Sequence, residues 1–413
     1  MKGIQFHIIF SISLSLFAFM MIVFPKLIIL PIFLFALIIV YGILKKEVEF
    51  KFNKILFLFF LLYIAYAVGT LFTENKEIAL KYLEYKLSFL LFPILFSFKL
   101  KEKISFEIIG IGLISGTVIL GLLGIISSFY CFRINNDINC YFSSSFSGIH
   151  HPSYATVFYL FALVFAWYGW KQKWKLYKNI SVFPFILFSF LGILCCMSLA
   201  GLLFFMMFLF FISLRAIFKR FNRKIFSISL LSMPILFYCL LMLTPSLKIQ
   251  FNTSIDYLNE YLQNPREFIK NKQTYVGGNE TRLIMWSAAS IEFKNNPLGV
   301  GTGNVDDHLY ERLIDLGQPE MAKKNYNPHN QYLQTGLEIG VIGLLILLGI
   351  LYLSAQYAIR TKNWLLLLLI ANLAFNMLFE SMLQRQSGIV FYTFWICILS
   401  IYPQQFETKK MEE

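Results

Sequence analysis

The chain has 413 residues, of which 58% are apolar and only 14% are charged, and its mean hydropathy is +0.65. Soluble domains are roughly 45–50% apolar and about 25% charged. This composition excludes a disordered chain, a coiled coil, a disulfide-stabilised miniprotein and an ordinary soluble enzyme. It predicts an all-α integral membrane protein. Because one membrane span takes roughly 20 apolar residues, the length allows about a dozen spans and one long loop.

The predicted spans follow one another in chain order. The apolar segments are 6–24, 27–44, 53–72, 78–98, 107–130, 152–170, 180–196, 199–216, 225–245, 330–353, 363–380 and 387–402. We therefore expect residues 1–245 to hold about nine transmembrane helices, and residues 329–413 to hold three more with a cytoplasmic tail. Residues 246–328 are as polar as a soluble protein, and we expect them to form a mostly helical loop domain before the tenth span. Within it, Thr253–Lys272 is expected to be an amphipathic helix interrupted by Pro265.

The net charge of +13 indicates the orientation of the chain in the membrane. If the N-terminus is cytoplasmic, most basic residues of the short loops fall on the inner side. The outer short loops and span ends then hold only Lys26, Lys76, Lys81, Lys86, Arg133 and Arg385. Cytoplasmic loops are enriched in Lys and Arg, whereas long loops cross the membrane regardless of their charge. We expect both termini inside and the long loop outside, and the charge needs no nucleic-acid partner.

The cysteines divide into two groups. Cys131 and Cys140 flank a hydrophilic stretch on the predicted outer side, where an oxidising compartment allows a disulfide. We expect that disulfide, with two unpaired thiols as the alternative. The remaining cysteines lie in apolar segments, where they are expected to be packing residues: Cys195, Cys196, Cys239 and Cys397.

Within the long loop, two motifs suggest ligand sites. The glycine-rich run Gly299–Asn304 has no strand–turn–helix unit around it and lacks the Gly-Lys-Ser/Thr ending of a phosphate loop, so it predicts a tight turn between two helices. Asp306, Asp307, His308 and Glu311 match no standard metal-ligand spacing and are more typical of a solvated helix start. We expect no metal and no cofactor.

The segment with candidate catalytic residues begins at Asn327. Asn327 is a good helix N-cap and Pro328 suits the first helical position, which places His329 in the first turn. A helix start attracts phosphate and disfavours imidazolium, so His329 is expected to be neutral and able to accept a proton. Asn330 and Tyr332 add hydrogen-bonding groups at the same level. The alternative is a histidine that only caps the span.

The run PHNQYLQTGLEIGVIG, residues 328–343, resembles the signature of the O-antigen ligase and O-antigen polymerase superfamily. The helix from Arg282 to Trp286, followed by NPLGVGTGN, is similar to that family's arginine-containing helix and Pro-x-Gly-x-Gly turn. The resemblance implies a metal-independent glycosyltransferase of the bacterial inner membrane, with its site facing the periplasm. It implies that Arg282 holds the diphosphate of an undecaprenyl-diphosphate-linked glycan, and that His329 activates the acceptor hydroxyl.

The chain departs from this family at one position. Many members carry Ser-Arg or Ser-Lys at the outer start of the eighth span, where this chain has Ser198 followed by Leu199. Another group must then replace the missing positive charge. We rank Arg385 first, with an interfacial anchor as its alternative role, and the other candidates are Lys86 and the histidine pair His150 and His151. That pair opens the sixth span, where it either binds acceptor or phosphate or caps the helix.

The expected function is transfer of a lipid-linked glycan to an acceptor hydroxyl. The acceptor is another lipid-linked glycan in a polymerase and lipid A-core in a ligase, and the sequence leaves both open. A polysaccharide transporter or lipid flippase is the alternative class, and it predicts charged residues near the bilayer midplane and broken helices. A third hypothesis is a purely structural membrane protein, but it does not explain why Arg282 and His329 are expected beside the same cavity.

Overall fold

The computed structural model describes residues 5–175, 180–220, 245–272 and 279–403. It is built almost entirely from helices, and six of them are long and apolar enough to cross a membrane. These six are Phe6–Val23, Pro25–Leu44, Lys54–Phe72, Phe106–Asn135, Pro152–Lys171 and Gln331–Arg360. Shorter apolar helices accompany them. The expectation of an all-α membrane protein is confirmed at this level.

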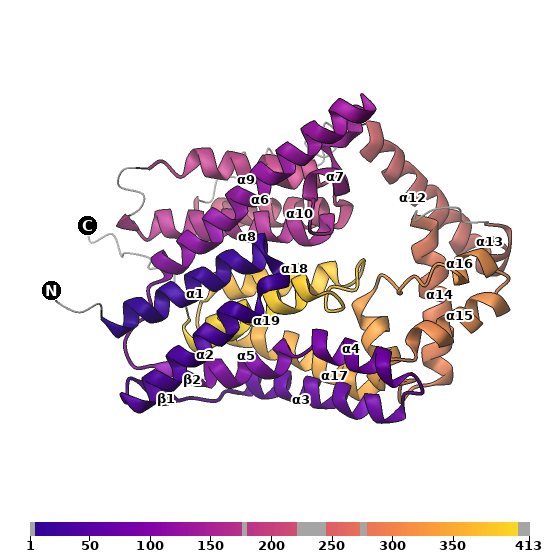
Figure 1. The fold of residues 1–413 in the computed structure, drawn as a ribbon. Coiled ribbons are helices and arrows are strands. Elements are labelled where there is room, and N and C mark those ends of the chain that lie inside the picture. Colours follow the sequence, from indigo (N-terminus) through magenta and orange to yellow (C-terminus); the bar gives the residue numbers. More distant parts are fainter. Residues whose placement is uncertain (1–4, 176–179, 221–244, 273–278, 404–413) are drawn as a thin grey trace.

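The bundle is formed by helices from both ends of the chain (Figure 1). The first helices are α1 (Phe6–Val23), η1 (Pro25–Leu27), α2 (Ile29–Leu44), α3 (Lys54–Gly69), η2 (Thr70–Phe72), α4 (Lys76–Tyr85), α5 (Ser88–Ser97) and α6 (Phe106–Asn135). They are followed by η3 (Ile138–Tyr141), α7 (Ser143–Ser147), α8 (Pro152–Lys171), α9 (Phe183–Cys196) and α10 (Leu199–Arg220). The last are α17 (Gln331–Arg360), α18 (Trp364–Asn376) and α19 (Gln386–Ile401). Every predicted apolar segment coincides with helix except 225–245, which lies outside the described residues but for Pro245.

Two predicted spans are broken helices. The segment 78–98 divides into α4 and α5 at Lys86 and Leu87. In α17, Ile339 and Gly340 leave the helical conformation, with Gly340 at φ +70°, so the helix consists of a short piece before the break and a long piece after it. Neither break was predicted, because periodicity reports an average over many residues and does not register one non-helical residue.

One end of the bundle holds a small sheet that the sequence did not predict. Strands β1 (Val48–Phe50) and β2 (Phe98–Leu100) pair antiparallel, with Val48 opposite Leu100. The backbone N–H of Leu100 donates to the hydroxyl of Tyr402, just after α19, at 2.6 Å. Nδ1 of His7, at the start of α1, lies 2.5 Å from Oε2 of Glu102, just after β2. The start of α1 and the end of α19 are therefore at the same end of the bundle.

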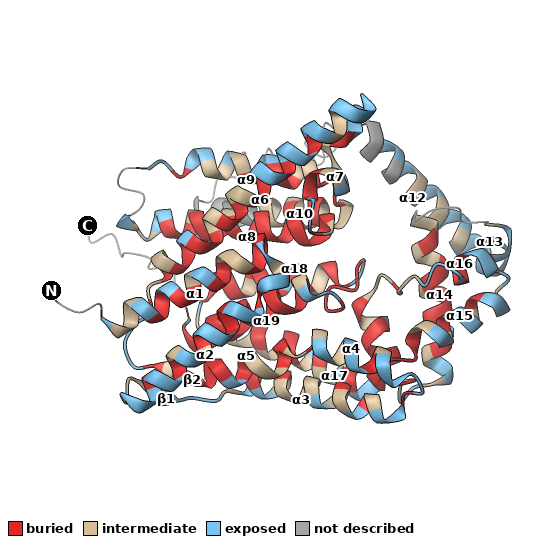
Figure 2. Ribbon diagram, in the orientation of Figure 1, coloured by how far each residue is buried: buried red, intermediate tan, exposed pale blue. Residues whose placement is uncertain are grey.

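Aromatic side chains fill the centre of the bundle. Phe17 of α1 stacks on Phe394 of α19 at 4.7 Å, and Trp395 packs against Phe161 of α8 at 4.9 Å. All of these side chains are almost completely buried. Figure 2 shows buried residues on the facing sides of these helices and exposed ones on the outer sides. The exposed residues include many large apolar side chains, as expected for a surface that meets lipid.

The long loop forms a second group of helices at the opposite end from the sheet (Figure 1). These are α12 (Pro245–Gln263), α13 (Pro265–Asn271), α14 (Asn279–Asn295), α15 (Val305–Asp315) and α16 (Pro319–Ala322). Their own apolar core includes Phe268, Met285 and Leu309, and Leu337 of α17 joins it. The expected helix break at Pro265 is confirmed, with the Asn264 side chain capping α13 through the N–H of Glu267 at 3.3 Å.

The glycine-rich turn between α14 and α15 fits into the break in α17. The N–H of Val300 donates to the carbonyl of Leu337 at 2.7 Å, and the N–H of Val341 donates to Pro297 at 2.9 Å. A Cβ on Gly340 would clash with the Leu298 backbone. The turn therefore supplies hydrogen bonds where the helix is interrupted, and its interpretation as a structural turn is confirmed.

Cys131 at the end of α6 and Cys140 in η3 form the expected disulfide. The bond fixes the segment between α6 and α8 to the end of α6. Cys196 and Cys397 are buried free cysteines and Cys195 is half-buried, as expected for packing residues, whereas Cys239 lies outside the described residues.

Candidate functional site

The segment around His329 differs from the sequence prediction. Helix α17 begins at Gln331, and its N-cap is Asn330, whose Oδ1 accepts the N–H groups of Tyr332 at 3.0 Å and Leu333 at 3.1 Å. Asn327 instead accepts the N–H of His329 at 2.9 Å, and His329 has φ +47°. This local turn keeps His329 out of the helix, so the prediction that Asn327 caps it was wrong.

The start of α17 is therefore not an open phosphate site. Besides the two N–H groups held by Asn330, the N–H of Gln331 donates to the carbonyl of Met377 at 2.8 Å. The first backbone donors of the helix all have partners within the protein. Any affinity for an anion must come from side chains, and the environment of His329 is set by its neighbours and not by the helix terminus.

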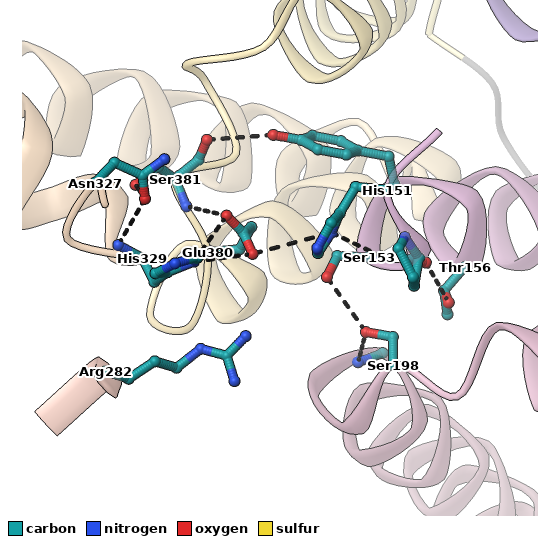
Figure 3. A network of polar contacts seen from close by, with 12 residues as sticks. His151, Ser153, Thr156, Ser198, Arg282, Asn327, His329, Glu380 and Ser381 are labelled. Carbon is teal, nitrogen blue, oxygen red and sulfur yellow. Dashed lines mark hydrogen bonds and ion pairs between the residues drawn. The ribbon is translucent and has the colours of Figure 1, made fainter. Parts of the chain in front are cut away.

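His329 contacts a carboxylate that the sequence analysis did not assign to the site. Its Nδ1 lies 3.3 Å from Oε1 and 3.4 Å from Oε2 of Glu380, which lies in the turn between α18 and α19 (Figure 3). The N–H of Ser381 also donates to Glu380 Oε1 at 3.3 Å. On the other side, Nδ1 of His151 is 4.0 Å from Glu380 Oε2. One buried carboxylate thus lies beside two histidines from distant parts of the chain.

Arg282 approaches the same group from the loop helix α14. Figure 3 shows its guanidinium extended toward Glu380 and His329. One nitrogen donates to Oδ1 of Asn279 at 3.1 Å, while the buried Nε has no acceptor among the described residues. The side chain is thus partly held by its own helix and retains hydrogen-bonding capacity at the site.

The charges of this cluster reinforce one another. Burial by itself raises the pKa of Glu380, but the hydrogen bond from His329 and the positive charges of His329, His151 and Arg282 outweigh it and lower that pKa to about 2. Burial also lowers the pKa of His151, and the nearby charges of Arg385 and Arg282 lower it further against the attraction of Glu380. Glu380 is therefore a carboxylate at neutral pH.

Arg385 lies just before α19 and is exposed. It lines a cavity of about 430 Å³ that also reaches Asn327, two residues before His329. Its charge acts on His151 as well. The structure thus brings Arg282, Arg385, His151 and His329 into one region, where three of them surround Glu380.

The two remaining candidates for the missing positive charge are turned away from this region. His150 is buried, with Nε2 2.7 Å from the carbonyl of Ile22 and Nδ1 3.0 Å from Ser387. Lys86 is also buried, with Nζ 2.7 Å from Gln384 Oε1 and 3.3 Å from Glu338 Oε1. The adjacent histidines therefore have different environments, and Lys86 bonds to the cavity lining through Gln384 without lining the cavity itself.

Asn330 and Tyr332 make bonds that fix α17 to α18 and to the turn after it. The Asn330 amide donates to the carbonyl of Leu378 at 3.2 Å, in addition to capping the helix. The Tyr332 hydroxyl donates to the carbonyl of Ala374 at 2.9 Å. Both side chains have structural partners that support the backbone just before Glu380.

The position where the family carries a basic residue lies at the edge of the cluster. Ser198 accepts the N–H of Gly201 at 3.3 Å and lies 3.5 Å from Ser153, which follows His151 by two residues. Figure 3 shows Ser198 at the start of α10, beyond Ser153. Leu199 is the first residue of this helix and is half-buried.

Asp306 and His308 of α15 have separate partners. The Tyr82 hydroxyl donates to Asp306 at 3.1 Å, whereas Glu292 of α14 binds His308 at 2.9 Å and Arg312 at 3.0 Å. Within the described parts of the chain, no three His, Cys, Asp or Glu side chains gather as metal ligands do. These residues tie α15 to α4 and α14.

The family model described as O-Antigen ligase matches residues 184–348. The resemblance to the O-antigen ligase and polymerase superfamily is confirmed. The matched segment includes Arg282, the glycine-rich turn and His329, and it ends before Glu380 and Arg385. A search of curated proteins finds no match to this chain.

The O-antigen ligase match supports a glycosyltransferase activity on lipid-linked glycans in a multi-pass membrane protein. Glu380 was not predicted as a site residue, because it stands at the polar end of an apolar segment. Its signal is a carboxylate at the outer end of a predicted span, where a charged side chain needs a partner. The partners, His329 and His151, are 51 and more than 200 residues away, so no local pattern identifies them.

Proposed function

We propose that the protein transfers a glycan from an undecaprenyl-diphosphate donor to an acceptor hydroxyl at the periplasmic face of the bacterial inner membrane. The observation that carries this proposal is the contact between His329 and Glu380 beside Arg282. A histidine held by a carboxylate is an arrangement suited to general-base catalysis, and a nearby guanidinium suits an anionic leaving group.

The first step assigned to His329 is removal of the acceptor proton. Glu380 accepts a hydrogen bond from the Nδ1–H of His329, which leaves Nε2 as the proton acceptor. When the acceptor oxygen attacks the anomeric carbon of the donor, its proton passes to Nε2. The charge of the resulting imidazolium is balanced by the Glu380 carboxylate, which is already ionised.

The second step is departure of undecaprenyl diphosphate. The bond between the anomeric carbon and the diphosphate oxygen breaks, and negative charge grows on that oxygen. Arg282 and Arg385 provide fixed positive charge, and a guanidinium can bind two oxygens at once. In this proposal Arg385 replaces the basic residue that the family carries at position 199, and no metal takes part in the reaction.

We also propose that both termini are cytoplasmic and that the chain crosses the membrane about twelve times. The loop helices α12–α16 lie at the opposite end of the bundle from β1 and β2 (Figure 1). The lysine-rich segments at 45–54 and 99–103 flank these strands, which supports a cytoplasmic location for the sheet. The catalytic cluster then faces the periplasm.

The transporter alternative has support from a specific observation. Transporters place charged residues within the membrane at broken helices, and Lys86 and Glu338 form a buried ion pair next to the breaks in α4–α5 and α17. The two functions differ in their product, since only a transferase forms a new glycosidic bond.

The deciding experiment uses the purified full chain in lipid nanodiscs with an undecaprenyl-diphosphate-linked glycan. Mass spectrometry follows the products after addition of either more lipid-linked glycan or lipid A-core. A lengthened glycan on undecaprenyl diphosphate indicates a polymerase, and glycosylated lipid A-core indicates a ligase. Movement of intact donor across a proteoliposome membrane without a new glycosidic bond contradicts the transferase proposal and supports the transporter.

A further inference from the structure

The cavity lined by Arg385 has walls of tyrosine rings and side-chain amides, unlike the cluster of charged residues and histidines around Glu380. Its volume of about 430 Å³ lies within the roughly 300–1,000 Å³ typical of small-molecule sites. Two tyrosines, Tyr82 and Tyr85 of α4, form one wall, with ring centroids 6.5 Å apart in an edge-to-face arrangement. The lining also includes Lys81 of α4, Asp306 of the loop helix α15 and the amides of Gln334 and Gln384.

The two amides are held in place by the buried ion pair. Gln384 accepts a hydrogen bond from Lys86 Nζ at 2.7 Å and donates to Glu338 Oε1, and Gln334 donates to the same oxygen at 3.2 Å. Lys86 also lies 5.3 Å from the centre of the Tyr82 ring. A network of this kind fixes the orientation of each member, so these lining groups are rigid.

This network has unused hydrogen-bonding capacity. Gln334 is 3% exposed, and its Oε1 has no partner among the described residues. Oε2 of Glu338, which is 1% exposed, also has none. Buried polar atoms are rarely left unpaired, and such atoms beside a cavity indicate that a donor from a bound molecule completes the network.

The charges beside the cavity determine the class of that molecule. Lys81 and Asp306 bring one positive and one negative charge to the lining, and Arg385 is the cation that the proposed function assigns to the diphosphate. The positive charge of Lys86 is balanced by Glu338 at 3.3 Å, so the region beneath the amides has no net charge. Amides, a tyrosine hydroxyl and aromatic rings bind neutral groups that are both donors and acceptors, and the rings provide apolar faces. A sugar ring has this combination of hydroxyls and apolar C–H faces, whereas a phosphate does not.

We propose that this cavity binds a sugar ring of the donor glycan, with Gln334 and Gln384 bonding its hydroxyls and Tyr82 and Tyr85 packing against its face. The assignment of the sugar to the donor rests on the proposed function, because Arg385 at the cavity wall is there assigned to the diphosphate to which the first sugar is attached. Gln334 and Tyr85 are then specificity residues for the sugar and take no part in proton transfer.

The test measures sugar binding and lipid binding separately. The probes are a panel of free oligosaccharides covering the common hexoses, 6-deoxyhexoses and N-acetylhexosamines, and sugar-free undecaprenyl diphosphate. Saturation-transfer NMR with the full chain in nanodiscs should detect at least one oligosaccharide bound to the wild type. Gln334→Leu should weaken that binding by about tenfold, as expected for loss of one hydrogen bond at a buried site, and leave the affinity for undecaprenyl diphosphate unchanged.

Two further variants keep the test informative. Tyr85→Ala removes a half-buried ring without touching the ion pair, and it should reduce oligosaccharide binding even if Gln334→Leu fails to fold. Tyr352→Phe is the matched control, because Tyr352 is an exposed tyrosine on α17. This variant should bind all probes as the wild type does. The proposal is overturned if no oligosaccharide binds the wild type, or if a folded cavity variant binds every probe normally. If oligosaccharides bind but the wild type forms no glycosidic bond, the proposed function fails while the sugar site remains.

Discussion

Nδ1 of His329 lies 3.3 Å from the carboxylate of Glu380; His329 lies just before the start of α17, and Glu380 lies in the turn after the end of α18. The contact depends on the left-handed backbone of His329, which places its ring outside α17. It also depends on the turn after α18, where Asn330 and Gln331 bind the carbonyls of Leu378 and Met377. The pair is therefore built by the packing of two helix ends.

Replacement of His329 by alanine should nearly abolish glycan transfer. Loss of a general base lowers rates by roughly 10²–10⁴-fold. Because His329 is half-buried and outside the helix, membrane insertion and the amount of folded protein should stay normal. The measurement is product formation by purified protein, with His7→Ala at the other end of the bundle as the control. Normal transfer by a folded His329→Ala variant would remove the catalytic assignment.

Replacement of Glu380 by glutamine should lower the rate of transfer and change the acid stability. The glutamine keeps the shape but cannot balance an imidazolium, so we expect a rate reduced by roughly 10²-fold or more. The pKa of Glu380 falls from 4.5 to about 2 on folding, so its stabilising contribution is complete above pH 4.5 and is lost as the pH falls through 2.

Thermal unfolding in detergent at several pH values checks the stability part of this prediction. The wild type should lose more stability between pH 4.5 and pH 2 than Glu380→Gln does. The matched control is Glu320→Gln, which removes an exposed carboxylate paired with Lys323 and should leave the pH dependence close to that of the wild type. If the melting temperatures of the wild type and Glu380→Gln change with pH in parallel, Glu380 is not an ionised carboxylate stabilised by the charges around it.

Arg385→Ala should weaken binding of undecaprenyl diphosphate by roughly 10–100-fold, the effect of losing a charge-assisted hydrogen bond. Arg385→Lys should restore only part of it, because lysine cannot bind two oxygens in a fork. Leu199→Arg should be tolerated, since position 199 is a half-buried helix start near the cluster. Unchanged donor affinity in Arg385→Ala, with a clear loss in His151→Ala or His150→Ala, would transfer the role to a histidine.

Gly340→Ala should destabilise the protein. Alanine at φ +70° costs about 1–3 kcal/mol, and its Cβ would also contact the Leu298 backbone. Displacement of the glycine-rich turn should shift α14 and with it Arg282, so transfer should fall together with the melting temperature. Gly349→Ala, within the regular part of α17 with only Leu58 nearby, is the control and should melt normally. Equal melting temperatures for the two variants would show that the turn does not depend on this glycine.

Reporter fusions test the orientation. Alkaline phosphatase, which is active only outside the cytoplasm, should be active when fused after residue 270 in α13. It should be inactive when fused after Lys103, between β2 and α6, where the chain is expected to be cytoplasmic. Activity in the opposite pattern would place the catalytic cluster on the cytoplasmic side and exclude a periplasmic glycan transferase.

The sequence by itself determined the membrane class, the positions of most helices, the Pro265 break and the disulfide. Each of these depends on local chemistry: apolar length, a missing backbone donor at proline, or two cysteines nine residues apart. The histidine and arginine of the family motif were also visible, since the motif is continuous in the chain.

The tertiary structure decided what surrounds those residues. Glu380 meets His329 and His151 only because α8, α17 and the turn after α18 converge, and the start of α17 is closed by partners about 50 residues away. Lys86 and Glu338 likewise meet at two helix breaks separated by 252 residues. Side-chain contacts at this range depend on the packing of several helices at once, and a pattern of residues along the chain carries no information about that packing.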